Sequence, residues 1–150
     1  MSGTPEPVPA GTYLGFDFGL RRIGVAVGES ITRSARPLTT LLCRDGNPDW
    51  ERVAALIEEW QPRALVVGLP RNDDGSDSAL TPQAERFARR LHGRFGLTVH
   101  TADERLSSHA AERHLAETGR GGRKLAKRKE TIDSLAAAII LESWLQEQHE

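Results

Sequence analysis

The sequence predicts an α/β fold built on a mixed five-stranded sheet with helices on both faces. Three strand-like segments come first, and helical and strand-like segments then alternate to the end of the chain. Adjacent early strands are typical of an antiparallel meander, whereas alternation of strands with helices is typical of parallel strands covered by crossover helices. A chain of 150 residues fits a single domain of this kind.

The first three strands are predicted from short apolar runs. Tyr13–Phe18 is an apolar run that contains one aspartate, and Arg22–Gly28 follows it after a turn at Gly19, so the two segments suggest a hairpin. Pro37–Cys43 is a third strand, placed at an edge or bounded by its proline. These segments form the predicted antiparallel part of the sheet.

The rest of the chain alternates between helix and strand. Asp49–Trp60 carries apolar residues at helical spacing, and Ala64–Leu69 is continuously apolar, as expected for a strand covered on both faces. Thr81 followed by Pro82 marks a helix start with Thr81 as the N-cap. The remaining predicted elements are a strand over Leu97–Thr101, a helix from Ser107 or Ser108 to near Gly119, and a helix over Thr131–Gln146.

Composition sets limits on the class of protein. Twenty basic and 21 acidic side chains give a formal charge of −1, so the distribution of charge must decide whether a polyanion binds. Residues 1–11 are rich in Pro and Gly, and we expect a disordered tail there, with a single domain over 12–146 and a short tail over 147–150. No apolar run approaches the roughly 18 residues that span a bilayer, so we expect a soluble, cytoplasmic protein without a membrane partner.

Asp17 is the most informative residue. An ionised carboxylate within an apolar strand is costly unless it is paired or bound to a metal. Alternation along the strand places Asp17 on the face of Tyr13 and Gly15, opposite Leu14 and Phe16. The structural alternative is an aspartate at a strand end that accepts hydrogen bonds from turn amides.

Two further carboxylate positions can converge on Asp17. Asp103 and Glu104 follow the last strand, at the sheet end where open α/β folds present ligand sites. Asp133 begins the last helix, whose small residues Ala136–Ala138 allow a close approach to the sheet. Asp17, Glu104 and Asp133 together would suit Mg²⁺ or Mn²⁺, although Asp133 also fits an ordinary first-turn helix acid. Two such ions can promote phosphodiester cleavage.

Basic and polar segments flank these acids. Arg21 and Arg22 in the first turn, and Arg105 beside Glu104, could contact a phosphate or could be solvated and salt-bridged. The polar loop with Asn72 and Asp74 could line the cleft or form a plain turn. A basic, Gly-containing segment precedes the last helix, and we expect it to be a flexible loop that attracts a nucleic acid backbone. Its basic residues are Arg120, Arg123, Lys124, Lys127, Arg128 and Lys129.

Four segments carry a family resemblance. They are DFGLRRIGVAV (Asp17–Val27), LVVGLPRNDDGS (Leu65–Ser76), TADERLSSHAAE (Thr101–Glu112) and IDSLAAAIILESWL (Ile132–Leu145). In this order they closely resemble the YqgF, or RuvX, family, and the resemblance covers about Tyr13 to Leu145.

The resemblance implies a ribonuclease H-like fold and a metal-dependent nuclease. It implies that Asp17, Glu104 and Asp133 are the catalytic metal ligands, with Mg²⁺ or Mn²⁺ as the cofactor. The family looks like nucleases that mature the 5′ end of pre-16S rRNA, so the implied partner is structured RNA. Resolution of Holliday junctions in branched DNA is the alternative activity.

Three other functions are suggested by parts of the sequence and are compared with the nuclease hypothesis. Asp17-Phe18-Gly19 imitates a kinase metal motif, but the chain has no glycine-rich nucleotide loop and no catalytic-loop motif. The phosphate loop of actin and sugar kinases would need two such domains. The non-enzymatic alternative is an RNA-binding ribosome-assembly factor. The chain is expected to be a monomer or a homodimer, and a junction resolvase ought to be dimeric.

Overall fold

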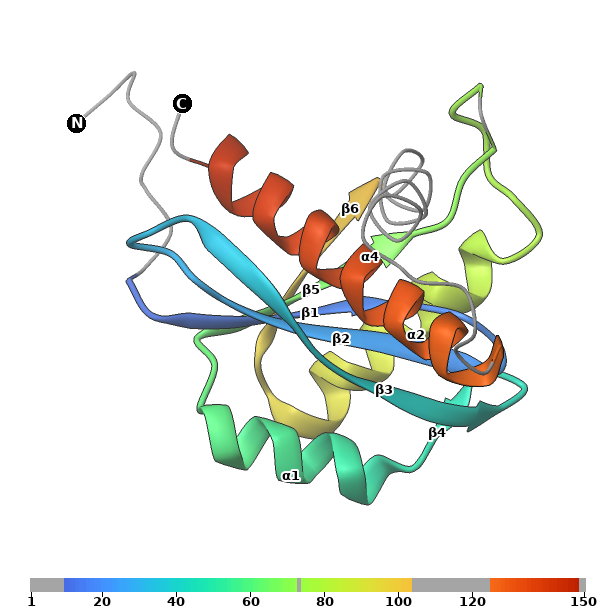
Figure 1. Cartoon of the computed structure of the whole chain (residues 1–150), viewed down its shortest axis with the longest axis horizontal. Coiled ribbons are helices and arrows are strands. Elements are labelled where there is room, and N and C mark those ends of the chain that lie inside the picture. The colour runs from blue at the N-terminus through green and yellow to red at the C-terminus, as the bar shows by residue number, and fades with distance from the viewer. Residues whose placement is uncertain (1–9, 73, 104–124, 149–150) are drawn as a thin grey trace.

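The computed structural model describes residues 10–72, 74–103 and 125–148. These residues form a six-stranded sheet in the order β4-β3-β2-β1-β5-β6 (Figure 1). The elements are β1 (Thr12–Asp17), β2 (Arg22–Glu29), β3 (Ser34–Arg44), β4 (Asn47–Pro48), α1 (Trp50–Trp60), β5 (Ala64–Leu69), α2 (Thr81–Phe95), β6 (Thr98–Asp103) and α4 (Leu125–Glu147).

Strand direction divides the sheet into two parts. β1, β2 and β3 are antiparallel neighbours, whereas β1, β5 and β6 run parallel. The carboxyl ends of β1, β5 and β6 therefore lie at one edge, and Asp17 and Asp103 are the last residues of the outer two of these three strands. Open α/β sheets bind ligands at this edge.

The sheet has one strand more than the five predicted. β4 is only two residues long and pairs with the end of β3, through Cys43↔Pro48 and Arg44↔Asn47. So short a segment carries no measurable alternation of apolar and polar residues, and its pairing depends on the turn that brings it back to β3. The mixed character of the sheet is confirmed.

The last helix begins earlier than predicted. α4 starts at Leu125 and not at Thr131, so the backbone of Lys127 to Lys129 is helical and does not belong to a flexible loop. The segment from Leu125 to Glu130 contains only Leu, Ala, Lys, Arg and Glu, all strong helix formers, and the glycines that suggested a loop precede it. The predicted helix from Ser107 or Ser108 to Gly119 lies outside the described residues.

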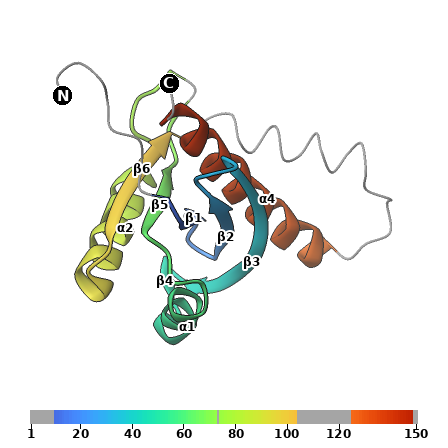
Figure 2. The same ribbon diagram turned by 90° about the vertical axis from the view of Figure 1, so that its left-hand side faces the viewer.

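Helices cover both faces of the sheet, as predicted. Figure 2 shows α2 and α4 on opposite sides of the strands. The core beneath α1 and α2 contains the large side chains Leu14, Phe16, Ile23, Val25, Leu65, Val67, Val53, Phe87 and Leu91. The core beneath α4 contains Tyr13, Ala26, Ala64, Val66, Ala137, Ala138, Ile140, Leu141, Trp144 and Leu145.

The beginning of β1 is tied to the β2–β3 hairpin. The Gly11 amide donates to Ser30 Oγ at 2.9 Å, and the Gly11 carbonyl accepts from the Ser30 amide at 3.1 Å. Residues 1–9 of the predicted N-terminal tail lie outside the described part of the chain. No helix within the described ranges combines the length and the apolar composition needed to cross a membrane.

His100 gives the core beneath α4 a dependence on pH. Its ring lies 4.7 Å from the Trp144 ring, between centroids, and burial lowers its pKa below the ordinary value. The neutral ring is therefore favoured in the folded state. The stabilisation from this shift is present above the unfolded pKa of about 6.5 and is lost as pH falls through the lower folded value.

We predict that His100→Phe flattens this part of the pH dependence. Phenylalanine keeps a ring against Trp144 but cannot take up a proton. The free energy of unfolding in urea should fall less in the variant than in the wild type between about pH 7.5 and pH 5.5. Equal losses in both proteins would contradict this role for His100.

Candidate active site

Asp17 lies at the end of the central strand β1 with a glycine on either side. It is paired in register with Gly24 of β2 and Gly68 of β5. It is half-buried on the face of the sheet covered by α4, the face that alternation with Tyr13 and Gly15 predicts. The register partners of Asp17 on both neighbouring strands therefore carry no side chain.

The start of α4 rests on the backbone of β2 next to Asp17. A Cβ atom added at Gly24 would lie 2.0 Å from the Asp133 carbonyl oxygen and 2.8 Å from the Ser134 nitrogen. Farther along the helix, a Cβ at Gly15 would lie 2.8 Å from Leu141 Cβ. Only glycine fits at such distances. The two glycines therefore allow α4 to place Asp133 against β2, at the position that is paired with Asp17.

Small residues on both α4 and β2 allow the helix to lie this close to the strand. The alanines at 136, 137 and 138 in α4 are all buried. On β2, Gly24, Ala26 and Gly28 share the face beneath α4, whereas Ile23, Val25 and Val27 fill the opposite core. The glycines were not among the predicted site residues. The strict alternation of small and branched residues in Ile23–Gly28 is the signal that could have identified them.

Asp17 and Asp133 line one open pocket with a volume of about 330 Å³. The turn after β1 forms much of its wall, and Leu80, just before α2, also lines it. The full lining is Asp17, Phe18, Gly19, Leu20, Arg21, Arg22, Leu80 and Asp133. The pocket therefore brings together two of the three predicted carboxylates and both predicted arginines of the first turn.

Arg22 pairs with Asp133 within this pocket. Arg22 Nε donates to Asp133 Oδ2 at 2.6 Å, and the two side chains are 31% and 22% exposed. Arg22 lies on the same face of β2 as Gly24, two residues away, which explains how it reaches the helix start. An ion pair with this exposure contributes little stability. Its main effect is to offset negative charge beside Asp17.

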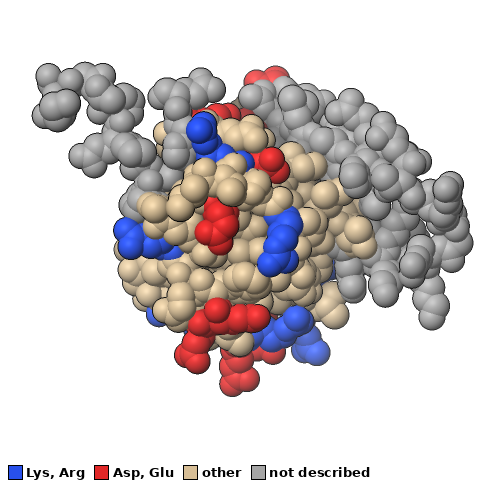
Figure 3. Space-filling view, turned by 60° about the vertical axis from the view of Figure 1, so that its left-hand side comes forward, with Lys and Arg blue, Asp and Glu red and all other residues tan. Residues whose placement is uncertain are grey.

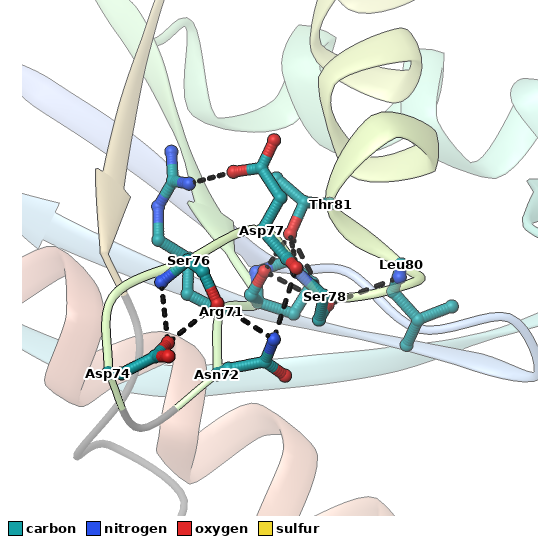
Figure 4. Close-up of polar contacts among 9 residues, drawn as sticks. Arg71, Asn72, Asp74, Ser76, Asp77, Ser78, Leu80 and Thr81 are labelled. Atoms are coloured by element: carbon teal, nitrogen blue, oxygen red, sulfur yellow. Dashed lines mark hydrogen bonds and ion pairs between the residues drawn. The ribbon is translucent and has the colours of Figure 1, made fainter.

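The predicted cleft residues Asn72 and Asp74 belong to the loop between β5 and α2 (Figure 4). Asn72 Nδ2 donates to Ser76 Oγ at 3.0 Å and to the Asp77 carbonyl at 3.1 Å. Asp74 Oδ1 accepts from the Ser76 amide at 2.9 Å and from Ser76 Oγ at 2.6 Å. These bonds are typical of a polar turn, and neither residue lines the Asp17 pocket.

Thr81 fixes the start of α2 to the end of β5. Its hydroxyl accepts from the Ser78 amide at 2.8 Å and donates to the Pro70 carbonyl (Figure 4). The prediction that Thr81 is the N-cap was wrong by one residue, since Leu80 is the N-cap and makes no side-chain capping bond. The Thr81 hydroxyl instead links the Ser78 amide to the Pro70 carbonyl, and the Leu80 amide donates to Ser78 Oγ at 3.2 Å.

The remaining predicted site residues either do not line the pocket or lie outside the described part of the chain. Asp103 ends β6 and pairs with Leu69 of β5, so one strand separates it from Asp17, and it does not line the pocket. His100, three residues before Asp103 on β6, packs on Trp144. Outside the described residues lie Glu104, Arg105, Arg120, Arg123 and Lys124, together with the side chains of Lys127, Arg128 and Lys129.

Comparisons of the sequence find close relatives of nearly the same length. Residues 11–147 match the family described as "RuvX: Holliday junction resolvase". A protein of Azotobacter vinelandii named "Putative pre-16S rRNA nuclease" is 55% identical over 136 residues, which cover 90% of this chain and 93% of the relative. A relative with the same name from Nitrosococcus oceani is 51% identical over 152 residues, covering 99% and 97%.

Comparisons of the structure find Holliday junction resolvases. The yeast mitochondrial resolvase aligns with a TM-score of 0.59 at 12% identity, covering 96% of this chain and 81% of that one. Thermus thermophilus RuvC in complex with a Holliday junction substrate aligns with a TM-score of 0.52 at 17% identity, covering 92% and 95%. At these identities the likeness concerns the fold, and the predicted ribonuclease H-like fold is confirmed.

We predict that Gly24→Ala displaces the start of α4. The added methyl group would lie 2.0 Å from the Asp133 carbonyl oxygen, so the helix or the strand must move. We expect a loss of about 1–3 kcal/mol in the free energy of unfolding, measured in urea.

Gly93→Ala in α2 is the matched control, since a Cβ there meets nothing within 4 Å. This substitution should stabilise the protein by about 0.5–1 kcal/mol, because alanine favours helix interiors. Wild-type stability in Gly24→Ala would contradict the close contact.

Proposed function

This chain belongs to the RuvX family, and we propose that it is a divalent-metal-dependent nuclease that hydrolyses phosphodiester bonds in precursor ribosomal RNA. The observation that carries the proposal is the convergence of Asp17 and Asp133 on one open pocket. Two carboxylates on a shared pocket, at the ligand-binding edge of the sheet, form a polar site that a packed core does not need.

The donor set fits a hard divalent cation. Carboxylate oxygens are preferred ligands of Mg²⁺ and Mn²⁺, and both ions keep open positions for water. Asp17 and Asp133 would hold such an ion, with Glu104 as the proposed third ligand, although Glu104 lies outside the described residues. When bound, the ion supplies Lewis-acid chemistry at the phosphate and promotes attack by water.

The surrounding side chains favour the binding of a polyanion in the pocket. Arg22 offsets the charge of Asp133, and exposed Arg21 adds a second guanidinium to the pocket wall. These cations reduce the repulsion between the carboxylates and an approaching phosphate. Phe18, Leu20 and Leu80 give the wall apolar parts that limit where the backbone can lie. The open shape suits entry of a polymer better than enclosure of a small molecule.

RNA is favoured over branched DNA as the substrate. Relatives that share half or more of their residues over nearly full length are named for pre-16S rRNA. The solved junction resolvases are below 20% identical, so their likeness extends to the fold only. Cleavage of Holliday junctions is the second candidate, because the matching family is described by that activity. We infer that the protein processes the 5′ end of pre-16S rRNA in the cytoplasm.

We predict that Asp17→Asn abolishes cleavage while the fold is retained. The amide keeps the size of the side chain but removes the charge that would bind the cation. Purified wild type and variant are compared on precursor rRNA and on four-way junction DNA with Mg²⁺ or Mn²⁺. Glu59→Gln on α1 makes the same chemical change on an exposed surface and should cleave as the wild type does.

The outcomes separate the candidate functions. Cleavage of precursor rRNA alone supports the proposal, whereas cleavage of the junction alone by a stable dimer would replace it with resolvase activity. RNA binding without cleavage by the wild type would identify an assembly factor. Equal activity in Asp17→Asn and the wild type would show that the activity comes from a contaminant.

We also predict that Mg²⁺ stabilises the folded protein through the carboxylate pair. A ligand present at ten times its Kd adds about 1.4 kcal/mol to the free energy of unfolding when it binds the folded state only. Thermal unfolding with Mg²⁺ and with EDTA should therefore differ in the wild type, and the difference should vanish in Asp17→Asn/Asp133→Asn. A difference that persists in the double variant would place the cation elsewhere.

A further inference from the structure

We propose that α2 carries a second nucleic-acid contact, which holds the phosphate backbone of the substrate beyond the Asp17 pocket. This inference rests on the proposed nuclease function and concerns how the substrate is held. The contact consists of four arginines of α2, here called the arginine surface. They are Arg86, Arg89, Arg90 and Arg94.

Helical spacing gathers these arginines on one side of α2. Arg86, Arg90 and Arg94 are four residues apart and form a stripe, with Arg89 beside it. The opposite side of the helix is buried in the core through Ala84, Phe87, Ala88 and Leu91. Glu85 is the only acidic residue of this helix, so the exposed side carries a strong positive charge.

The arginine surface forms no ion pair with an acid in the described ranges of the chain. The ion pairs found there are Arg22–Asp133 and Arg71–Asp77, and neither includes an arginine of α2. Asp45 lines a small cavity together with Arg86 and Arg90 but forms no ion pair with them. Uncompensated guanidinium groups on a rigid helix attract polyanions.

Two of the arginines are held in place by an aromatic ring. The guanidinium carbons of Arg94 and Arg90 lie 4.2 Å and 5.1 Å from the centroid of the Trp50 ring. Arg90 Nη1 also donates to Asn47 Oδ1 at 2.7 Å. Stacking fixes the planar group but leaves donors at its edge, so less side-chain entropy is lost when a phosphate binds.

The cavity that contains Arg86 and Arg90 adjoins the active-site pocket. Phe18 lines both the Asp17 pocket and the cavity that contains Arg86 and Arg90. The Gly46 amide in the wall of that cavity donates to the Leu20 carbonyl in the wall of the pocket, at 2.8 Å. The pocket and this cavity are therefore neighbours, and in the proposed path the nucleic acid passes around this end of the sheet from the pocket to the arginine surface.

The length of the surface suits several phosphates. From Arg86 to Arg94 the helix rises about 12 Å. The surface is thus long enough to contact more than one phosphate of a strand. It lies across the sheet from α4 (Figure 2), so it differs from the predicted basic segment before Asp133.

Acidic side chains on α1 also restrict the course of the bound nucleic acid backbone. In Figure 3, acidic side chains lie along the lower rim, on the side of α1, with basic side chains beside them. The acids of α1 are Glu51, Glu58 and Glu59. Because these side chains repel phosphates, the favoured course of the backbone follows α2 and avoids α1.

The test measures binding of a labelled single-stranded RNA as a function of salt, in the Asp17→Asn background so that the RNA stays intact. Arg86→Gln/Arg89→Gln removes two charges that do not stack on Trp50. We expect a roughly tenfold loss of affinity at low salt. The slope of log K against log salt should become shallower by about 1.4, since each lost contact to a single strand contributes about 0.7.

Matched variants separate a specific contact from a general effect of charge. Arg33→Gln/Arg52→Gln changes two exposed arginines outside α2 and should keep the slope of the parent. Arg86→Lys/Arg89→Lys keeps the charge and should also keep it. An unchanged slope in Arg86→Gln/Arg89→Gln, or an equal fall in the Arg33→Gln/Arg52→Gln control, would overturn the proposal.

Cleavage kinetics then distinguish this proposal from the function on which it rests. In the cleavage-competent chain, Arg86→Gln/Arg89→Gln should raise KM and leave kcat unchanged, because the surface binds without touching the reacting atoms. A fall in kcat at unchanged KM would overturn it. If the wild type cleaves no nucleic acid, the nuclease function fails, but the salt slopes still decide whether the arginine surface binds RNA.

Discussion

The contact between α4 and the backbone of β2 is the constraint on which the site depends. At Gly24 there is no space for even one methyl group, since its Cβ would lie 2.0 Å from the Asp133 carbonyl oxygen. Gly24 is also the register partner of Asp17. One close contact therefore sets the depth of the helix on the sheet and places a second carboxylate beside the first.

The same contact explains why the two faces of the sheet have different cores. Large aliphatic and aromatic side chains fill the space beneath α1 and α2, whereas glycine and alanine predominate on β2 beneath α4. Dense packing without voids requires α4 to lie close to the sheet wherever the side chains between them are small. The small residues thus serve both the stability of the fold and the geometry of the site.

Charge is distributed to match this geometry. Arg22 offsets the acid that α4 brings to the pocket, and the arginines of α2 lie on the other face of the sheet, where they have no carboxylate partners among the described residues. A net charge of −1 conceals this separation. Local fields, and not the overall balance, decide whether a protein attracts a polyanion.

The sequence by itself determined most of the local elements and singled out Asp17 as a candidate site residue. β5 was predicted to the residue and α1 within one residue, because periodicity and bounding residues such as Pro70 are local properties. Asp17 stood out because a carboxylate in an apolar strand needs an explanation. β4 and the start of α4 were missed or misplaced, since a two-residue strand has no periodicity and the basic residues before Asp133 fit a loop or a helix.

Only the tertiary structure decided which residues meet. Arg22 and Asp133 are separated by 111 positions, yet they share one ion pair in the pocket of Asp17. Asn72 and Asp74, which have the same polar character, bond within their own turn. Strand order, register and the depth of α4 on the sheet fix these outcomes, because each depends on packing between segments that no local pattern encodes.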